Sequence, residues 1–272
     1  GGSLCSAPAS QGQLSMNTQE LVAWRHDLHR LAERSGAEDQ TAAFVHRALA
    51  RLAPDRLVGG LAGHGILAVF YGSKEGPTVL VRCELDALPI PETLEHLPYA
   101  SRAVGVSHKC GHDGHMAMVL GLGARLASQR PGRGAVALLF QPAEETGEGA
   151  ALVRNAEQLT EIDCTLNLAV HNIPGFTRNS VILRSGTFAL ASVGVRFQLL
   201  GATAHAAEPE RGHSPALALA SLLQLLPTLS QECVPLGTMS KVTVTHARLG
   251  EPTFGTAPGE ATLYVTLRAE ST

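Results

Sequence analysis

The spacing of apolar residues in the first part of the chain alternates between helical and strand-like. Leu21, Trp24, Leu28 and Leu31 recur at helical intervals within residues 18–34. Similar stripes predict helices over residues 40–52, 114–128 and 149–159, and apolar runs of strand length occupy residues 66–71, 78–83, 135–140 and 165–170. Because strands alternate with helices, we predict an α/β domain with a mostly parallel mixed sheet.

The pattern changes near Ser185. A strand over residues 191–200 and a helix over 215–226 precede two further strands, at 241–247 and 261–268. This order is the opening of a ferredoxin-like α+β unit, whose second helix and last strand are missing here. The first fifteen residues are small, polar and glycine-rich, unlike a secretion signal. We therefore expect a disordered or tag-like terminus at 1–15, a larger domain at 16–185, and an inserted, incomplete domain at 186–272.

The overall composition is that of an ordinary soluble protein. Hydrophobic residues make up 44% and charged residues 17%, so disorder is not expected. A net charge of -3 argues against a nucleic-acid partner, and the apolar runs are too short to span a membrane. The five cysteines are odd in number and widely scattered, which favours reduced thiols and a cytoplasmic location.

A cysteine and three histidines gather at residues 108–115, His-Lys-Cys-Gly-His-Asp-Gly-His. Thiolate and imidazole are good ligands for zinc-like divalent ions, and Cys110 and His112 at a helix start can face one point. Gly111 and Gly114 allow the backbone to turn tightly there. For this segment alone, a buried cysteine beside ordinary surface histidines is an equally good interpretation.

Two further polar segments follow predicted strands. Glu144 and Glu145 come after the strand ending at Phe140, and His171 follows the strand ending at Val170. Sheets of this class place ligands at strand ends, and adjacent extended residues point to opposite sides, so one carboxylate can bind metal while the other faces substrate or water. Alone, these segments are more simply an acidic turn and a core histidine. Together with the thiolate, they suffice for a two-metal hydrolytic site with a bridging hydroxide and a carboxylate base.

Four segments match, in order and spacing, the amidohydrolase branch of the M20 metallopeptidases. They are residues 84–89 (Glu-Leu-Asp-Ala-Leu-Pro), 108–115, 141–145 and 171–174. Residues 18–270 as a whole resemble this branch, which includes aminoacylases, hippurate hydrolases and auxin-conjugate hydrolases. The resemblance implies a zinc-peptidase-like catalytic domain that binds two divalent ions (zinc, manganese, nickel or cobalt) and an inserted lid and dimerisation domain. It also implies a homodimer that hydrolyses the amide bond of N-acyl or N-aroyl amino acids or small peptides.

The same resemblance assigns roles to single residues. The implied metal ligands are Cys110, His112, Glu145 and His171. Glu144 takes the role of general acid and base. Asp86 resembles the second carboxylate of the family's Asp-x-Asp motif, which orients a ligand, and Glu84 replaces the first. Within residues 201–207, His205 resembles a histidine that reaches the partner subunit's active site and helps to bind the developing oxyanion.

The chain departs from the family pattern at two points. Relatives carry Asn where this chain has Gly255, and they supply a last histidine ligand near their C-terminus, whereas the last histidine here is His246. We therefore expect a fragment of an active enzyme that lacks the C-terminal return segment of its catalytic domain. The alternative is a truncated, catalytically impaired protein that acts as a binding or assembly partner. A cysteine hydrolase based on Cys110 and His112 would leave the carboxylate pair and His171 unexplained.

Overall fold

The computed structural model describes residues 17–92, 97–177, 179–183 and 185–270. They form two compact units, one extending to Phe176 and the other beginning at Thr177. The terminus expected to be disordered or tag-like, residues 1–15, lies outside the described residues. Every site residue expected from the sequence, apart from His205, belongs to the first unit.

The first unit consists of helices and strands that alternate along the chain. The helices are α1 (Thr18–Leu31), α2 (Asp39–Arg51), α3 (His112–Ser128), α4 (Gly149–Arg154) and α5 (Glu157–Thr160), and the strands are β1 (Arg56–Leu61), β2 (Gly65–Tyr71), β3 (Thr78–Glu84), β4 (Ala135–Gln141) and β5 (Cys164–Ala169). A capping box fixes the start of α1: Asn17 Oδ1 accepts the Glu20 N–H at 3.0 Å, and Glu20 Oε2 accepts the Asn17 N–H at 2.9 Å.

The prediction of a single helix over residues 149–159 is wrong, because the chain forms the two short helices α4 and α5 there. They are separated at Ala156, whose extended backbone (ψ 127°) cannot continue a helix. The break lets Val153 and Leu159 reach the same apolar cluster on one face of the sheet. Tertiary packing, which a helical stripe does not reveal, therefore decides this segment.

The sheet of the first unit has the strand order β1-β2-β4-β3-β5. β3 pairs in parallel with both β4 and β5, whereas β2 is antiparallel to β1 and to β4. Two of the four pairings among the described strands are thus antiparallel, which confirms the predicted mixed sheet; of these five strands, β2 runs opposite to the other four. The sequence hides β1 because Gly59 and Gly60 interrupt its apolar pattern, and the register of the hairpin shifts at this point.

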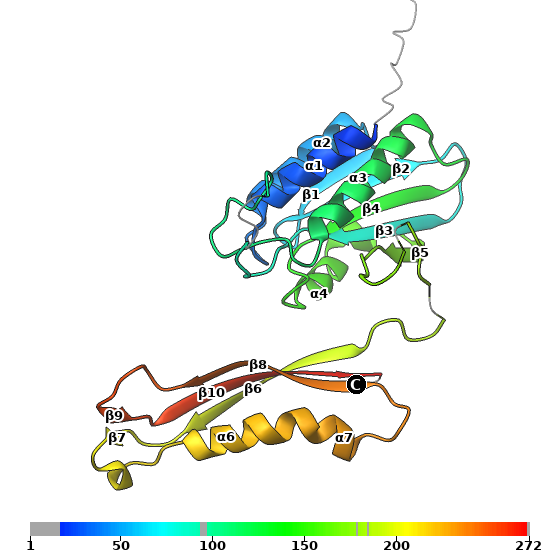
Figure 1. Cartoon of the computed structure of the whole chain (residues 1–272). Coiled ribbons are helices and arrows are strands. Elements are labelled where there is room, and N and C mark those ends of the chain that lie inside the picture. Colours follow the sequence, from blue (N-terminus) through cyan, green and yellow to red (C-terminus); the bar gives the residue numbers. More distant parts are fainter. Residues whose placement is uncertain (1–16, 93–96, 178, 184, 271–272) are drawn as a thin grey trace, which may run out of the picture. The chain divides into compact units, whose positions relative to one another are not determined.

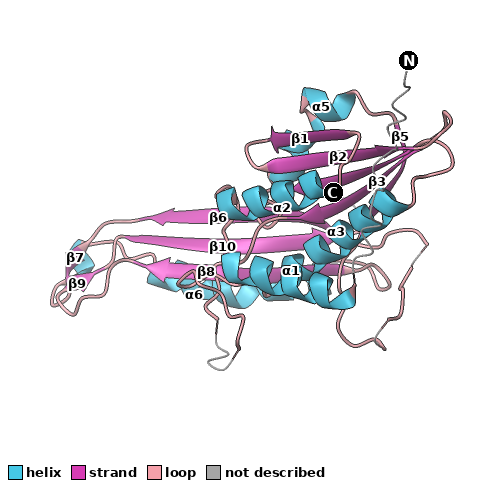
Figure 2. Ribbon diagram, turned by 90° about the horizontal axis from the view of Figure 1, so that it is seen from above, coloured by secondary structure: helices cyan, strands magenta, loops and turns pink. Residues whose placement is uncertain are grey.

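Helices cover both faces of this sheet, as Figures 1 and 2 show. Alternate residues of β2 enter different cores: Ile66, Ala68 and Phe70 pack with α1, α2 and α3, and Leu67 and Val69 pack on the side of α4. Burial of one such large apolar side chain stabilises the fold by about 1.5–3 kcal/mol. The two cores make the sheet a rigid support for the loops at its strand ends.

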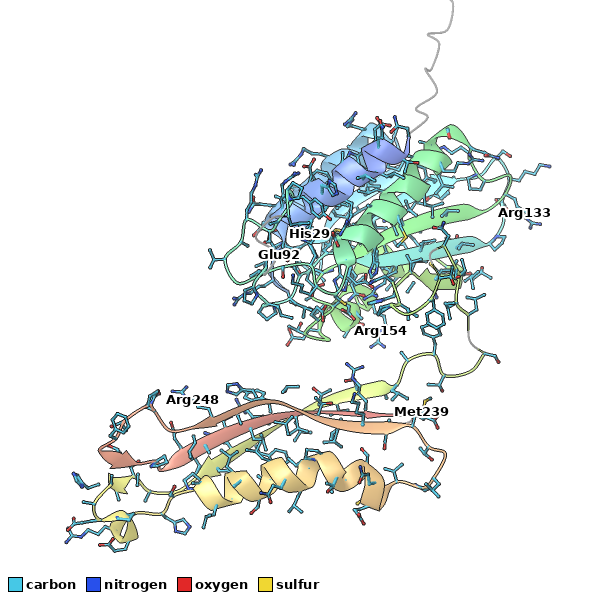
Figure 3. The ribbon with its side chains drawn as sticks, in the orientation of Figure 1. His29, Glu92, Arg133, Arg154, Met239 and Arg248 are labelled. Atoms are coloured by element: carbon cyan, nitrogen blue, oxygen red, sulfur yellow. The ribbon has the colours of Figure 1, made fainter. Side chains whose placement is uncertain are left out.

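Polar contacts fasten α1 to the start of α3. His29 bonds through Nδ1 to Asp113 Oδ2 (2.9 Å) and through Nε2 to Glu92 Oε2 (2.8 Å), and Figure 3 labels His29 and Glu92. Arg25 Nε donates to the same Asp113 oxygen at 2.9 Å. The hydrogen bond with Asp113 raises the pKa of His29, and the bond with Glu92 adds to this rise against the opposing effect of burial. The network holds the first turn of α3 in place.

The second unit is a three-stranded antiparallel sheet with a helix on one face (Figure 1). Its elements are β6 (Ala191–Leu200), β7 (Ala204–His205), α6 (Ala216–Leu225), α7 (Leu229–Cys233), β8 (Ser240–Leu249), β9 (Thr256–Ala257) and β10 (Glu260–Ala269), with 3-10 turns at Pro209–Arg211 and Leu226–Thr228. β10 lies between β6 and β8. Leu219 of α6 packs with Leu263 and Val265 of β10. The predicted order of strand, helix, strand, strand is present, and the role of the second unit as a lid stays a prediction.

None of the helices in the described part of the chain has the length and apolar character to cross a membrane.

Candidate metal centre

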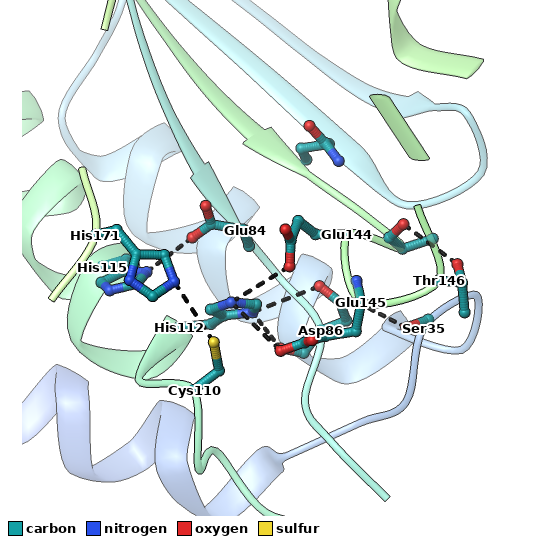
Figure 4. Close-up of polar contacts among 12 residues, drawn as sticks. Ser35, Glu84, Asp86, Cys110, His112, His115, Glu144, Glu145, Thr146 and His171 are labelled. Carbon is teal, nitrogen blue, oxygen red and sulfur yellow. Dashed lines mark hydrogen bonds and ion pairs between the residues drawn. The ribbon is translucent and has the colours of Figure 1, made fainter. Parts of the chain in front are cut away.

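The predicted site residues of the first unit meet at one edge of the sheet. β3, β4 and β5 are parallel neighbours, so their carboxyl ends lie together. Asp86 follows β3, Glu144 and Glu145 follow β4, and His171 follows β5, while His112 begins α3 beside them (Figure 4). The fold therefore assembles side chains that are far apart in sequence.

His112 lies at the middle of this arrangement and is completely buried. Its Nδ1 lies 2.7 Å from the backbone carbonyl oxygen of Asp86. Because a carbonyl only accepts, Nδ1 carries a proton, which directs Nε2 toward Glu144 Oε2 and Glu145 Oε1, each 3.7 Å away. Histidine ligands in metalloproteins are held in this way, with one nitrogen donating to the protein and the other facing the ion.

Among the residues that the structure describes, three groups of potential ligands share His112. They are Cys110, His112 and His171; His112, Glu144 and Glu145; and Glu84, His112 and His115. The donor atoms of each group lie within 4.8 Å of one another, and Cys110 Sγ is 3.5 Å from His171 Nε2. Ligands of one zinc-like ion lie about 3–4 Å apart, because zinc–ligand bonds are about 2.0–2.3 Å long. The donor atoms of these groups are thus close enough for a metal ion to bind between them.

The electrostatics of the site favour a positive charge at His112. Burial lowers the pKa of His112, but the polar side chains of Asp86 and Cys110 beside it and the negative charge of Glu84 outweigh this effect and raise it to about 11. A bound cation would supply the same charge in place of the proton on Nε2. Burial likewise opposes ionisation of Asp86, but hydrogen bonds from His112, Ser35 and the Glu145 backbone lower its pKa to about 2.

The two adjacent glutamates differ in their surroundings. The Glu145 side chain is 20% exposed and its backbone N–H donates to Asp86 Oδ2 at 2.9 Å, whereas the Glu144 side chain is 36% exposed. Burial, and then the charge of Glu145, raise the pKa of Glu144. Glu144 is therefore the carboxylate of the pair that is more open to water, whereas Glu145 has the more buried carboxylate and a backbone N–H held by Asp86.

Gly111 allows the loop of Cys110 to approach the loop of His171. Its φ is +94°, and a Cβ at this position would lie 2.7 Å from Asn172 Oδ1. His171 is oriented by its neighbour, because its Nδ1 lies 2.8 Å from the Asn172 carbonyl oxygen. Its Nε2 therefore faces Cys110. The cysteine and histidine are thus brought together where the Gly111 backbone approaches the Asn172 side chain, which leaves no room for a Cβ without a shift of that side chain.

Sequence reasoning missed a buried hydrogen-bonded pair, Glu84 and His115, beside His171. His115 Nδ1 is 2.8 Å from Glu84 Oε2, and His115 Nε2 accepts the backbone N–H of Asn172 at 3.0 Å. Glu84 and His115 are each 1% exposed. Two spacings could have pointed to the pair: His115 is three residues beyond His112 on a helix, and Glu84 is two residues before Asp86.

His205, the remaining predicted catalytic residue, lies in β7 of the second unit. It pairs with Thr256 of β9, its side chain is exposed, and its Nδ1 accepts the Ala207 N–H at 3.1 Å. These contacts orient the ring within its own unit. Its catalytic role stays a prediction.

The residues of the first unit fit a divalent metal. In the described part of the chain, Asp86 Oδ1, His112 Nε2 and Glu145 Oε1 are buried without a hydrogen-bond partner. Such atoms cost free energy unless something binds them, and these three belong to the donor groups or to the carboxylate that orients them. Sulfur, nitrogen and oxygen donors in this number suit zinc and the neighbouring transition metals. This chemistry defines the class: an α/β protein with a metal-binding centre at its strand ends.

Comparison with known proteins identifies the family. The sequence model of the family described as Peptidase family M20/M25/M40 matches residues 80–266. The chain is 36% identical over 221 residues to an N-acetyl-L-cysteine deacetylase of Bacillus subtilis, covering 79% of this chain and 51% of that protein. It is 32% identical over 251 residues to the IAA-amino acid hydrolase ILR1-like 5 of Arabidopsis thaliana, covering 92% and 56%. A solved structure from Bacillus subtilis, the YXEP protein, described as a dinuclear metal binding peptidase from the M20 family, matches with a TM-score of 0.66 at 26% identity, covering 92% and 64%.

The chain belongs to the M20 peptidase family, and its relatives confirm the amidohydrolase branch that the motifs predict. It spans 51% and 56% of the two curated relatives named above.

Proposed function

We propose that this protein is a metal-dependent amidohydrolase that cleaves the amide bond of N-acyl or N-aroyl amino acids or small peptides. The observation that carries the proposal is the pair of donor groups that share the buried, unpartnered Nε2 of His112. The relatives support the substrate class, since their names describe a deacetylase of acetylcysteine and a hydrolase of an amino acid conjugate. A cytoplasmic location is part of the same proposal, in keeping with the free thiols of Cys83, Cys110, Cys164 and Cys233.

Two divalent ions would be held by the two groups. Cys110, His112 and His171 would hold one, and Glu145 would serve the other, with Glu144 beside it; the single free nitrogen of His112, Nε2, would bind one ion only. Bound ions of this kind polarise a carbonyl group and make water a better nucleophile at neutral pH. The donor set suits zinc, manganese, nickel or cobalt, and metal availability decides among them.

Glu144 is assigned the proton transfers. It is the more exposed carboxylate of the two, and its Oε2 lies 3.7 Å from His112 Nε2, so it can meet both the metal centre and water. It would take a proton from the attacking water and return it to the departing amine. Asp86 would keep His112 and Glu145 in position through the contacts described above.

The second unit is assigned the role of lid and dimerisation domain, and His205 that of a catalytic residue supplied by the partner subunit. The family resemblance of residues 201–207 supports this assignment. A mixture of Glu144→Gln and His205→Ala chains tests it, because each heterodimer would hold one intact site. At equal amounts with random exchange, about a quarter of the wild-type activity should return. No recovery in a mixture shown to contain heterodimers would contradict the assignment.

Matched substitutions of the two glutamates test the main proposal. Glu144→Gln should retain metal but lose turnover of N-acyl amino acids by about 10²–10⁴-fold, since it removes the proton acceptor alone. Glu145→Gln should lose bound metal, measured by plasma mass spectrometry after dialysis. Full turnover by Glu144→Gln, or activity that survives removal of metal by chelators, would overturn the proposal, and the second result would favour a thiol mechanism at Cys110.

A further inference from the structure

A fully buried carboxylate outside the donor groups contacts the turn that carries the glutamates. Glu38 is 0% exposed, and its Oε1 accepts the backbone N–H of Ala143 at 2.7 Å across 105 residues of sequence. The bond is short and charge-assisted, as is typical of the stronger hydrogen bonds in proteins. It joins the start of α2 to the residue immediately before Glu144.

Ala143 occupies an unusual conformation. Its φ is +49°, in the left-handed region that residues with a Cβ seldom adopt. Such a conformation persists only where surrounding contacts enforce it. The turn is closed at its far end by Gly149 N–H to Ala143 O (3.0 Å) and Gly147 N–H to Glu144 O (2.8 Å). Glu38 supplies the contact on the other side of the same residue.

Two buried carboxylates from different elements thus hold alternate N–H groups of this turn. Glu38 accepts from Ala143, and Asp86 accepts from Glu145 at 2.9 Å. Glu144 lies between these two anchors. The direction in which the two glutamate side chains leave the backbone is therefore set by Glu38 at one end and Asp86 at the other.

Local roles do not account for Glu38. It precedes α2, but its side chain makes no capping hydrogen bond to this helix. The first turn of α2 is instead bound by Glu33, whose Oε2 accepts from Thr41 N and Oγ1 at 2.8 Å each. The His64 ring does not pair with Glu38 either, because its Nε2 lies 4.0 Å from Glu38 Oε2, beyond hydrogen-bond range. Within the described residues Oε2 has no hydrogen-bond partner. Burial of a carboxylate is costly, so the contact with Ala143 is the feature that explains it.

We propose that Glu38 is a positioning residue, whose carboxylate holds Ala143 in its left-handed conformation and so aims Glu144 and Glu145 at the metal centre. The effect of Glu38 on metal binding rests on the proposed function, because the orientation of these glutamates matters only if they serve a metal site. The structural part of the proposal, the restraint of the turn by Glu38, is independent of any metal.

Hydrogen exchange measured by mass spectrometry tests the structural part. Glu38→Ala should speed exchange in residues 142–148 by about tenfold or more, since it removes a charge-assisted bond. Glu38→Gln keeps an oxygen that can accept from Ala143 and should retain most of the protection. Glu33→Ala is the matched control, because it weakens α2 without touching the turn. Equal exchange of the turn in Glu38→Ala and wild type, or equal loss in Glu33→Ala, would overturn the proposal.

Cobalt titration of the same proteins tests the consequence. Glu38→Ala should bind the ion served by Glu145 about 10–100-fold more weakly, as expected when a residue that orients a ligand is lost. The thiolate-to-cobalt absorption of the Cys110 group should persist. Simultaneous loss of both signals would indicate general unfolding and overturn a specific role. A wild-type chain that binds no cobalt would contradict the proposed function, and the exchange data would still decide on Glu38.

Discussion

Asp86 and Glu145 are joined by a hydrogen bond from the Glu145 backbone N–H to Asp86 Oδ2, 2.9 Å long, that links the loop after β3 to the loop after β4. The same oxygen accepts the Ser35 hydroxyl at 2.6 Å, and the Asp86 backbone carbonyl faces His112 Nδ1 at 2.7 Å. One residue therefore orients ligands in both proposed metal positions, although it belongs to neither donor group.

This relationship predicts that Asp86→Asn weakens metal binding by about 10–100-fold, the usual loss when a residue that orients ligands is changed. The amide can keep one oxygen on Glu145, but its NH₂ group would then face the protonated Nδ1 of His112, 3.5 Å from Asp86 Oδ1. Metal retained after dialysis measures the effect. Ser35→Ala is the control, because it removes one donor and leaves the carboxylate in place. Equal metal content in Asp86→Asn and wild type would contradict the role.

Gly111→Ala should destabilise the first unit. The left-handed backbone costs a residue with a Cβ about 1–2 kcal/mol, and the collision with Asn172 Oδ1 at 2.7 Å adds to that cost. Urea unfolding followed by the fluorescence of Trp24, the single tryptophan, reports on this unit. Gly114→Ala is the matched control, since nothing lies within 4 Å of its added Cβ and alanine favours a helix. A Gly111 variant as stable as the control would refute the close contact.

Leu138→Ala should lower the free energy of unfolding of the first unit by about 2–5 kcal/mol, because the side chain is completely buried in the core under α3. Met118→Ala, on the same unit but 51% exposed, should change it by less than about 0.5 kcal/mol. Trp24 fluorescence again provides the signal. Similar losses in the two variants would mean that Leu138 is not buried in this core.

The stability contributed by His29 should depend on pH. Its pKa is raised in the folded state by Asp113 and Glu92, so its charge stabilises the fold fully below the unfolded pKa of about 6.5. This contribution is lost as the pH rises through the higher folded pKa. The stability difference between wild type and His29→Gln should therefore be larger at pH 5.5 than at pH 9. His26→Gln should not reproduce the trend, because the pKa of His26 is lowered, by burial first and then by Arg25. An equal difference at both pH values would rule out the charged network.

Much of the fold follows from local pattern. The helices α1, α2 and α3 and the strands β2, β3, β4 and β5 begin and end close to the predicted positions, because their apolar periods are long and uninterrupted. β1 was missed because its glycines carry no pattern, and the antiparallel pairing of β1 and β2 could not be read from the order of elements. Strand direction depends on which neighbours each strand meets in space.

The sequence by itself determined the donor types at this site, since a Cys-x-His pair, adjacent glutamates and a histidine after an apolar run are visible without coordinates. Only the tertiary structure decided that these groups converge, because convergence requires three parallel strands to end at one edge. It also decided the supporting residues: Glu38 and His115 lie 105 and 57 residues from the backbone N–H groups that they hold. Such contacts leave no periodic trace in the chain, because they join single residues whose distance in sequence is set by the whole fold.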